Sequence, residues 1–226
     1  MTNFFSSSIG KKIMMAGLGL FLITFLLVHL GINLLLIFFE ERDTFNIAAH
    51  FMATNIVIKI FEVVLFGGFL LHIIYGFIVQ IQNWLARPVS YKKTNYSETS
   101  FFSKYMIHTA VIIFVFIIIH LFDFYLKAKL FHGAEEVIIN GKTYEDLGLL
   151  VVRKFQIPGF VIFYISCFLF LGFHLLHGFQ SAFQTLGLNH KTYTPVVKIL
   201  GIIYSIVVVA GFVSIPLVIY FTHINN

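Results

Sequence analysis

The sequence predicts an all-α integral membrane protein with five transmembrane helices, on the basis of its composition, its hydrophobic runs and the breaker residues between them. Hydrophobic residues make up 59% of the chain and charged residues 11%, against roughly 45–50% and about 25% in a soluble domain. A water-soluble fold of 226 residues could not cover that much apolar surface. We expect a single membrane domain over residues 1–226, without a separate soluble catalytic domain.

Five hydrophobic runs are each long enough to cross a bilayer, which takes about 20 apolar residues in a helix. The predicted spans are 13–38, 56–80, 105–127, 158–182 and 197–221. Polar segments separate them, with breaker residues at Arg87-Pro88, Pro158 and Pro195. The first run is too long for the apolar core of a signal peptide and lacks a small-residue cleavage site, so we expect it to remain as a span.

The charges of the connecting segments orient the chain, because Lys and Arg gather on the cytoplasmic side of membrane proteins. One side carries Lys11, Lys12, Arg87, Lys92, Lys93, Lys104, Lys191 and Lys198, with Glu98 as the acidic residue. The other side carries Arg42, Lys127, Lys129, Lys142, Arg153 and Lys154 together with Glu40, Glu41, Asp43, Glu135, Glu136, Glu145 and Asp146. We therefore expect a cytoplasmic N-terminus and an external C-terminus.

Two features exclude whole classes of function. The basic residues are scattered in loops and form no stripe interleaved with exposed aromatic residues, so we expect no nucleic-acid partner. The single cysteine, Cys167, has no second thiol to pair with, which excludes disulfides and cysteine-ligated zinc or iron–sulfur sites. We expect Cys167 to be a small core residue.

Histidines deep in four of the spans are the residues that point to a function. His29 lies in the first span, His72 in the second, His120 in the third, and His174 and His177 in the fourth. An ionisable ring at such a depth needs a partner, and is a candidate functional residue for that reason. One such histidine alone could equally form a hydrogen bond between helices, but a neutral imidazole is also a good ligand for iron or zinc.

These histidines fall at two depths. With a rise of 1.5 Å per residue, His29 and His120 lie roughly 5–6 Å beyond the middle of outward-running spans, and His72 and His174 about 6 Å beyond the middle of inward-running spans. Zinc would need its ligands at one level, within about 2.1 Å of the ion. Two levels about 12 Å apart instead suit two haem b groups, each held by two histidines from opposite faces. We expect His29 and His120 to bind the outer iron, and His72 and His174 the inner iron.

Glycines give a second sign, because a flat macrocycle between helices needs a surface without side chains. Gly76 follows His72 by four residues, and Gly178 follows His174 by four, each on the same helix face. Both glycines could equally serve close helix packing. His177 lies on the same general face as His174, and three roles stay open for it: iron ligand in place of His174, contact with a haem propionate, or a simple hydrogen bond.

These residues together resemble the cytochrome b membrane anchor of succinate dehydrogenase and fumarate reductase, of the single-chain, two-haem type. The first span is similar to that family's opening helix at Lys12, Met15, Gly17, Leu20, Phe25, His29 and Asn33. The fourth span resembles its His-x-x-x-Gly stretch from His174 to Gly178, followed by Gly187, and the second span repeats the first part. The resemblance implies the same two ligand pairs in a bundle of the first four helices, and it favours His174 over His177.

The resemblance also implies partners and a location. The chain would pass electrons between membrane quinone, with menaquinone expected near the outer haem, and a flavoprotein and an iron–sulfur subunit on the cytoplasmic face. FAD and the iron–sulfur clusters would belong to those partners, in a complex of the bacterial cytoplasmic membrane that could dimerise. We expect the basic segments 83–104 and 187–198 to be docking surfaces. Whether succinate is oxidised or fumarate reduced stays open.

Quinone chemistry exchanges protons as well as electrons, so we expect a carboxylate near the outer haem. Asp123 lies one turn beyond His120, and Glu62 lies at the outer end of the second span, so either is a candidate. Glu62 could instead form an ion pair with Lys59, three residues before it, without a redox role. The fifth span lacks the acidic residue that some two-haem family members use to move protons across the membrane.

Two other functions fit part of the pattern. The cytochromes of formate dehydrogenases and hydrogenases also bind two haems, and this alternative stays open. The cytochrome b of bc-type complexes places two ligands on each of two helices, whereas this chain has one histidine that can pair on each of four helices. A proton-coupled transporter would use the histidines and Asp123 as a proton relay, but such folds often have inverted repeats and broken helices, and the sequence shows neither.

Overall fold

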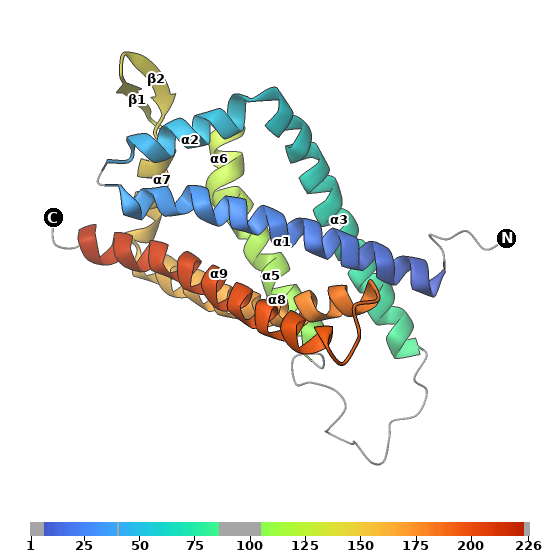
Figure 1. Ribbon diagram of the computed structural model, residues 1–226. Helices are drawn as coiled ribbons and strands as arrows, with labels where there is room; N and C mark the ends of the chain where they lie inside the picture. The colour runs from blue at the N-terminus through green and yellow to red at the C-terminus, as the bar shows by residue number, and fades with distance from the viewer. Residues whose placement is uncertain (1–6, 40, 86–104, 224–226) are drawn as a thin grey trace.

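Five long helices form the framework of the computed structural model, which describes residues 7–39, 41–85 and 105–223 (Figure 1). The helices are α1 (Ser8–Phe38), α3 (Ile56–Leu85), the continuous stretch α5 (Met106–His120), η2 (Leu121–Leu126) and α6 (Lys127–Lys129), then α8 (Pro158–Thr185) and α9 (Tyr193–His223). Each is long and apolar enough to cross a membrane. The five expected spans are confirmed in number and order, and several helices extend a few residues beyond them.

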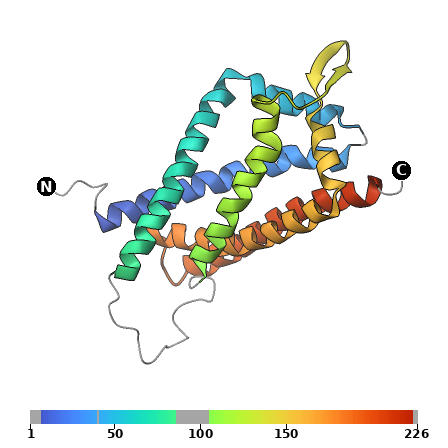
Figure 2. The ribbon, with the colours of Figure 1, turned by 180° about the vertical axis from the view of Figure 1, so that it is seen from behind.

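The long helices pack unequally. In Figures 1 and 2, α1, α8 and α9 run roughly along one another, while α3 and α5 cross them obliquely. Helix α8 packs along α9, α1 contacts α3, α8 and α9, and α5 contacts α8. The core therefore centres on α8, around Tyr164, Cys167, Phe168, Val208 and Phe212. The expectation that Cys167 is a buried core residue is confirmed.

Short elements form a cap at the end of the bundle opposite the N-terminus (Figure 1). They are α2 (Asp43–Thr54), the hairpin of β1 (Glu136–Ile139) and β2 (Lys142–Glu145), and α7 (Leu147–Phe155). Only polar connections were predicted here, so an all-α description misses the hairpin. Its turn residues, Asn140 and Gly141, have φ angles of +49° and +77°, the backbone that an Asn-Gly pair adopts readily in a type I′ turn.

Helix α7 attaches the cap to the bundle. The Asp146 side chain caps its first turn by accepting a hydrogen bond of 2.8 Å from the Leu149 amide. One face of α7, with Leu150, Val151, Val152 and Phe155, is buried, and α7 contacts both α8 and α9. The amphipathic pattern of this short helix thus closes the end of the α8–α9 pair.

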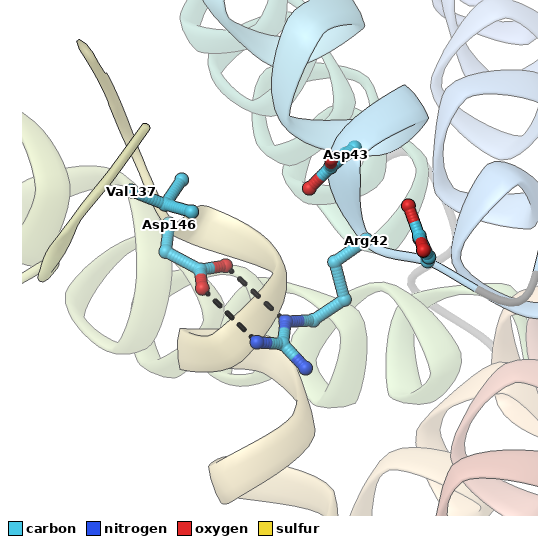
Figure 3. Close-up of a pocket in the computed structure, with 5 residues that line it drawn as sticks. Arg42, Asp43, Val137 and Asp146 are labelled. Carbon is cyan, nitrogen blue, oxygen red and sulfur yellow. Dashed lines mark hydrogen bonds and ion pairs between the residues drawn. The ribbon is translucent and has the colours of Figure 1, made fainter. Parts of the chain in front are cut away.

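A polar network joins α2 to the start of α7 (Figure 3). Arg42 donates two hydrogen bonds to the Asp146 carboxylate, of 3.4 and 3.2 Å, and the Asn46 amide donates a third of 2.9 Å. Asn46 and Asp146 are 1% and 5% exposed. Burial acts to raise the pKa of Asp146, but the hydrogen bonds from Arg42, Asn46 and the Leu149 amide, with the charge of Arg42, bring it below the usual value.

Asp146→Ala should destabilise this cap by about 1–3 kcal/mol, because it leaves the buried Asn46 amide and the Leu149 N–H without their acceptor. Since the folded-state pKa of Asp146 is lowered, its stabilisation is complete above the unfolded-state pKa of about 3.9 and is lost as the pH falls through the folded value. Thermal unfolding followed by circular dichroism should therefore separate wild type from variant at pH 7, and the difference should shrink as the pH falls below about 4.

Glu136→Ala is the matched control, since Glu136 is an exposed carboxylate of the same cap. It should change the free energy of unfolding by no more than about 0.5 kcal/mol, the usual range of a surface substitution. Its melting temperature should therefore stay close to that of wild type. Equal melting temperatures for Asp146→Ala and wild type at pH 7 would contradict the role of the network.

Candidate functional site

The buried histidines lie in two pairs. The rings of His29 and His120 have centres 5.8 Å apart with planes at 89°, and those of His72 and His174 have centres 6.4 Å apart with planes at 72°. The structure thus brings together the residues that were paired from their depths. His177 lies one turn from His174 on α8, and no ring contact joins it to either pair among the described residues.

Each pair bridges two helices that face each other across the bundle. Helix α1 packs against α3 and α8, and α5 packs against α8, but neither α1 with α5 nor α3 with α8 is a closely packed pair in the described parts of the chain. His29 nevertheless meets His120 across α1 and α5, and His72 meets His174 across α3 and α8. The two pairs therefore lie in the interior between the four helices, and not in the interface of two directly packed helices.

Two helices, α1 and α8, place the two pairs at separate levels. On α1, Gly19 lies against the His72 ring, with 3.7 Å from its ideal Cβ position to the ring carbon, and His29 follows ten residues later. On α8, Tyr164 precedes His174 by ten residues and contacts His120, with ring centres 6.2 Å apart. Ten residues of helix correspond to about 15 Å. The levels are thus separated by a distance similar to the one expected from the sequence.

The spacing within each pair suits two axial ligands of one metal ion. Two imidazoles that bind an ion from opposite sides, with about 2 Å to each nitrogen, hold their ring centres about 6 Å apart. Each pair also contains a buried ring nitrogen, Nδ1 of His72 and of His120, without a hydrogen-bond partner among the described residues. Buried polar atoms in folded proteins are nearly always satisfied, so the residues fit a bound metal centre at each pair.

Aromatic side chains surround the pair of His29 and His120. Phe25 stacks on His29 at 5.4 Å, and Phe212 of α9 lies 5.9 Å from the same ring. Phe116, Phe124 and Tyr164 flank His120, with ring centres between 5.3 and 6.2 Å from it. The fifth helix therefore also lines the site, a contribution that the sequence pattern did not reveal.

His120 is the last residue before the π-helical segment η2. Segments of this kind occur often at functional sites, because the wider turn changes the direction in which side chains project. Asp123 and Tyr125 within η2 contact different neighbours: Asp123 bonds to Lys154 and Tyr164, and Tyr125 bonds to Glu62 of α3. The segment thus ties the helix of His120 to both sides of the bundle.

The pair of His72 and His174 has a polar support that the sequence did not predict, the hydroxyl of Thr109. It donates a hydrogen bond of 2.8 Å to the Met106 carbonyl and lies 3.4 Å from His174 Nδ1. Because the hydroxyl proton is donated to the Met106 carbonyl, the hydroxyl oxygen can accept a hydrogen bond from the N–H group of His174 Nδ1. That arrangement leaves Nε2 of His174 with a free lone pair, as in metal-binding histidines.

The glycines that follow the inner histidines differ in their surroundings. A Cβ at Gly76 would lie 3.1 Å from the Met15 side chain of α1, so this glycine serves a close helix contact, one of the two roles considered for it. A Cβ at Gly178 would lie 3.9 Å from the Met106 side chain, which is an ordinary contact. Unlike Gly76, this position would accommodate a methyl group without moving its neighbour.

The two candidate carboxylates each form an ion pair. Lys154 Nζ lies 2.5 Å from Asp123 Oδ1, and the Tyr164 hydroxyl donates to Asp123 Oδ2 at 3.1 Å. Glu62 accepts hydrogen bonds from the Tyr125 hydroxyl and from Lys129. The partner suggested for Glu62, Lys59, is wrong: η2 and α6 continue the helix of His120 far enough to bring Lys129 to Glu62 instead.

The docking segments expected from charge are only partly described. Of the segment 83–104, residues 86–104 lie outside the described residues, including Arg87, Lys92, Lys93 and Lys104, as does Glu40 on the other side. Of the segment 187–198, residues 187–192 form the turn between α8 and α9, and residues 193–198 begin α9. The segment begins at Gly187, whose φ of +91° ends α8 in the left-handed conformation that glycine favours.

No family model matches the chain, and neither does a curated protein or a solved structure. Within the described ranges, no three His, Cys, Asp or Glu side chains gather closely enough to form a metal cluster. The arrangement therefore offers two-histidine sites and not the three- or four-ligand sites of zinc.

Proposed function

We propose that this protein is a di-haem cytochrome b, in which His29 and His120 hold one haem and His72 and His174 hold the other. The observation that carries the proposal is the meeting of each pair across opposite helices, with ring centres 5.8 and 6.4 Å apart. A haem with two histidine ligands supplies reversible one-electron transfer. The chain itself supplies the ligands, keeps them apart from water, and sets the two haems at different depths.

A reduced-minus-oxidised spectrum of the purified protein tests the proposal. Bands of b-type haem, with two haems per chain, are the expected result. A protein purified from haem-supplied cells without those bands would exclude the cytochrome and leave the proton-coupled transporter as the function to test.

We further propose that the cytochrome is the membrane anchor of a succinate dehydrogenase or fumarate reductase in a bacterial cytoplasmic membrane. The support is the similarity of the first span around Lys12 and His29, together with the order of the histidines. Electrons would pass between membrane quinone, with menaquinone expected, and a flavoprotein and iron–sulfur subunit at the N-terminal side of the bundle. Purifying the protein in a detergent that keeps the complex intact, and identifying the subunits that purify with it, tests this step. A formate dehydrogenase or hydrogenase subunit in their place would assign the cytochrome to a different complex.

Of the two carboxylates, Glu62 is better placed to exchange protons with quinone. Quinones reach their sites through the lipid, and Glu62 lies on α3 between the exposed residues Phe61 and Val63. Its side chain is 20% exposed and its partner Lys129 38% exposed. Asp123 is less accessible, at 15%. We assign proton exchange to Glu62, and to Asp123 the positioning of η2 beside His120.

Thr109→Val should weaken the binding of the inner haem. Removing the hydroxyl takes away the acceptor for His174 Nδ1, and the loss of such a support to a metal ligand typically lowers affinity by about 10–100-fold. Haemin titration of the haem-depleted protein measures this affinity. The outer haem should be unaffected.

Thr109→Ser keeps the hydroxyl and should restore the affinity. Thr24→Val is the matched control, because Thr24 is another residue of a long helix whose hydroxyl, within the described part of the chain, bonds to the Leu20 carbonyl of its own helix alone. Equal affinities in Thr109→Val and Thr24→Val would show that the Thr109 hydroxyl does not support His174.

A further inference from the structure

A stripe of small and polar residues continues along α8 from the inner histidine. Gly178, Ser181 and Thr185 follow His174 by four, seven and eleven residues, and these intervals keep them on one face of the helix. Most of α8 is apolar, so hydroxyl groups on this face need an explanation. The stripe runs from the inner pair toward the end of the bundle where α1 begins.

A matching residue lies on α1. Gly19 lies against the His72 ring, and Lys12 precedes Gly19 by seven residues, on the same face two turns away. On both helices, seven residues correspond to about 10 Å. Lys12 and Ser181 are therefore displaced from the inner pair by the same amount, in the same direction, on the faces that contact or carry the two histidines.

These residues meet in one hollow between the start of α1 and the end of α8. Its lining consists of Ile9, Lys12, Ile13, Ser181, Gln184 and Thr185. Lys12 forms no ion pair with another described residue, and the side chains of Ser181 and Gln184 form no hydrogen bond within the described chain. An ammonium group, a hydroxyl and an amide thus remain free to donate hydrogen bonds to one ligand.

We infer that this hollow binds the carboxylate side chains of the inner haem, its propionates. The inference rests on the proposed function. The two propionates of a haem leave one edge of an otherwise apolar ring, so they need hydrogen-bond donors and a positive charge on one side of the iron. Lys12 supplies the charge, and Ser181 and Gln184 supply neutral donors. A phospholipid phosphate has similar chemistry, but only the haem explains why the hollow is aligned with His72 and His174 on two helices.

Lys12→Met tests the inference, with Lys11→Met as its matched control. Both variants remove one positive charge from the same turn of α1, but Lys11 does not line the hollow. The positive charge of Lys12 favours the reduced haem, so its loss should lower one midpoint potential in a spectroelectrochemical titration. The affected haem should be the one that His174→Ala removes, and Lys11→Met should leave both potentials unchanged.

Infrared difference spectra with haem ¹³C-labelled at the propionates give a second measurement. Lys12→Met should shift the labelled carboxylate bands, and Lys12→Arg, which keeps the charge, should retain the wild-type potential. Ser181→Ala should shift the same bands by a smaller amount, because it removes a neutral donor.

The outcomes separate the inference from the proposed function. A wild-type protein without haem would contradict the cytochrome itself. Two haems with the same potentials and labelled bands in Lys12→Met, Lys11→Met and wild type would overturn the propionate site alone. If Lys12→Met instead loses bound anionic phospholipid, measured by mass spectrometry of the extracted lipid, while both potentials stay unchanged, the hollow is a lipid site and the inference is wrong.

Discussion

His29→Ala and His120→Ala should each halve the haem content of the purified protein and leave the same haem behind. Each substitution removes one of two ligands to a single iron, and the remaining histidine faces it alone across the interior between α1 and α5. His72→Ala and His174→Ala should remove the other haem, because their rings form the second pair. Haem per chain, measured as the pyridine complex, gives the content, and redox titration identifies which haem remains.

The pairing makes this result specific. The double variant His29→Ala/His120→Ala should match either single variant in content and potential, since all three lose one haem, whereas His29→Ala/His72→Ala should lose both. His177→Ala is the matched control, as it removes a histidine of the same helix whose ring makes no ring contact with either pair within the described residues. Loss of haem from His177→Ala with full retention in His174→Ala would exchange the roles of these two residues and contradict the proposed inner site.

Hydropathy and helix geometry were sufficient to predict the spans and the pairs. A run of apolar residues has to cross the bilayer as a helix, since its backbone groups find no other partners in lipid. The fixed rise per residue and the alternating direction of the spans then set the depth of every histidine. Depth alone allowed His29 to be matched with His120, and His72 with His174, before any helix was placed beside another.

Hydropathy and helix rise do not predict how each helix is rotated about its axis. Hydropathy does not show which face of an apolar helix turns inward when lipid and protein interior are equally apolar. The contact of Phe212 with His29 and the position of Thr109 beside His174 were missed for this reason. The π-helical turn after His120 has no hydrophobic period of its own, and the error in the partner of Glu62 followed from it.

The cap was missed for a different reason. The charges of the segments between spans orient the chain, but they do not show that these segments fold into elements of their own. Asn140-Gly141, preceded by the β-branched residues 137–139 and followed by Thr143 and Tyr144, indicates a hairpin. Asp146 before an amphipathic stretch indicates the start of a helix. Both signals were present in the sequence and both correspond to elements of the structure.

Glu62→Gln should reduce electron transfer from quinol to the haems by about 10²–10⁴-fold, the range expected for loss of a general acid–base group. The amide keeps the size of the side chain and can still accept from the Tyr125 hydroxyl, but it cannot take up a proton. Stopped-flow reduction of the oxidised protein by a water-soluble naphthoquinol measures this step without any partner subunit. Reduction by dithionite, which transfers electrons without this proton exchange, should proceed at the wild-type rate with both haems present.

Asp123→Asn separates proton exchange from positioning. Asp123 bonds to Lys154 and to Tyr164, and Tyr164 in turn contacts His120, so the substitution should shift the potential of the outer haem and leave quinol oxidation within about tenfold of wild type. Lys129→Met provides the complementary comparison, because it removes the partner of Glu62 but keeps the carboxylate. If Asp123→Asn were to abolish quinol oxidation while Glu62→Gln retained it, the two carboxylates would exchange roles, and quinone would have to reach the side of η2 that faces α7 and α8.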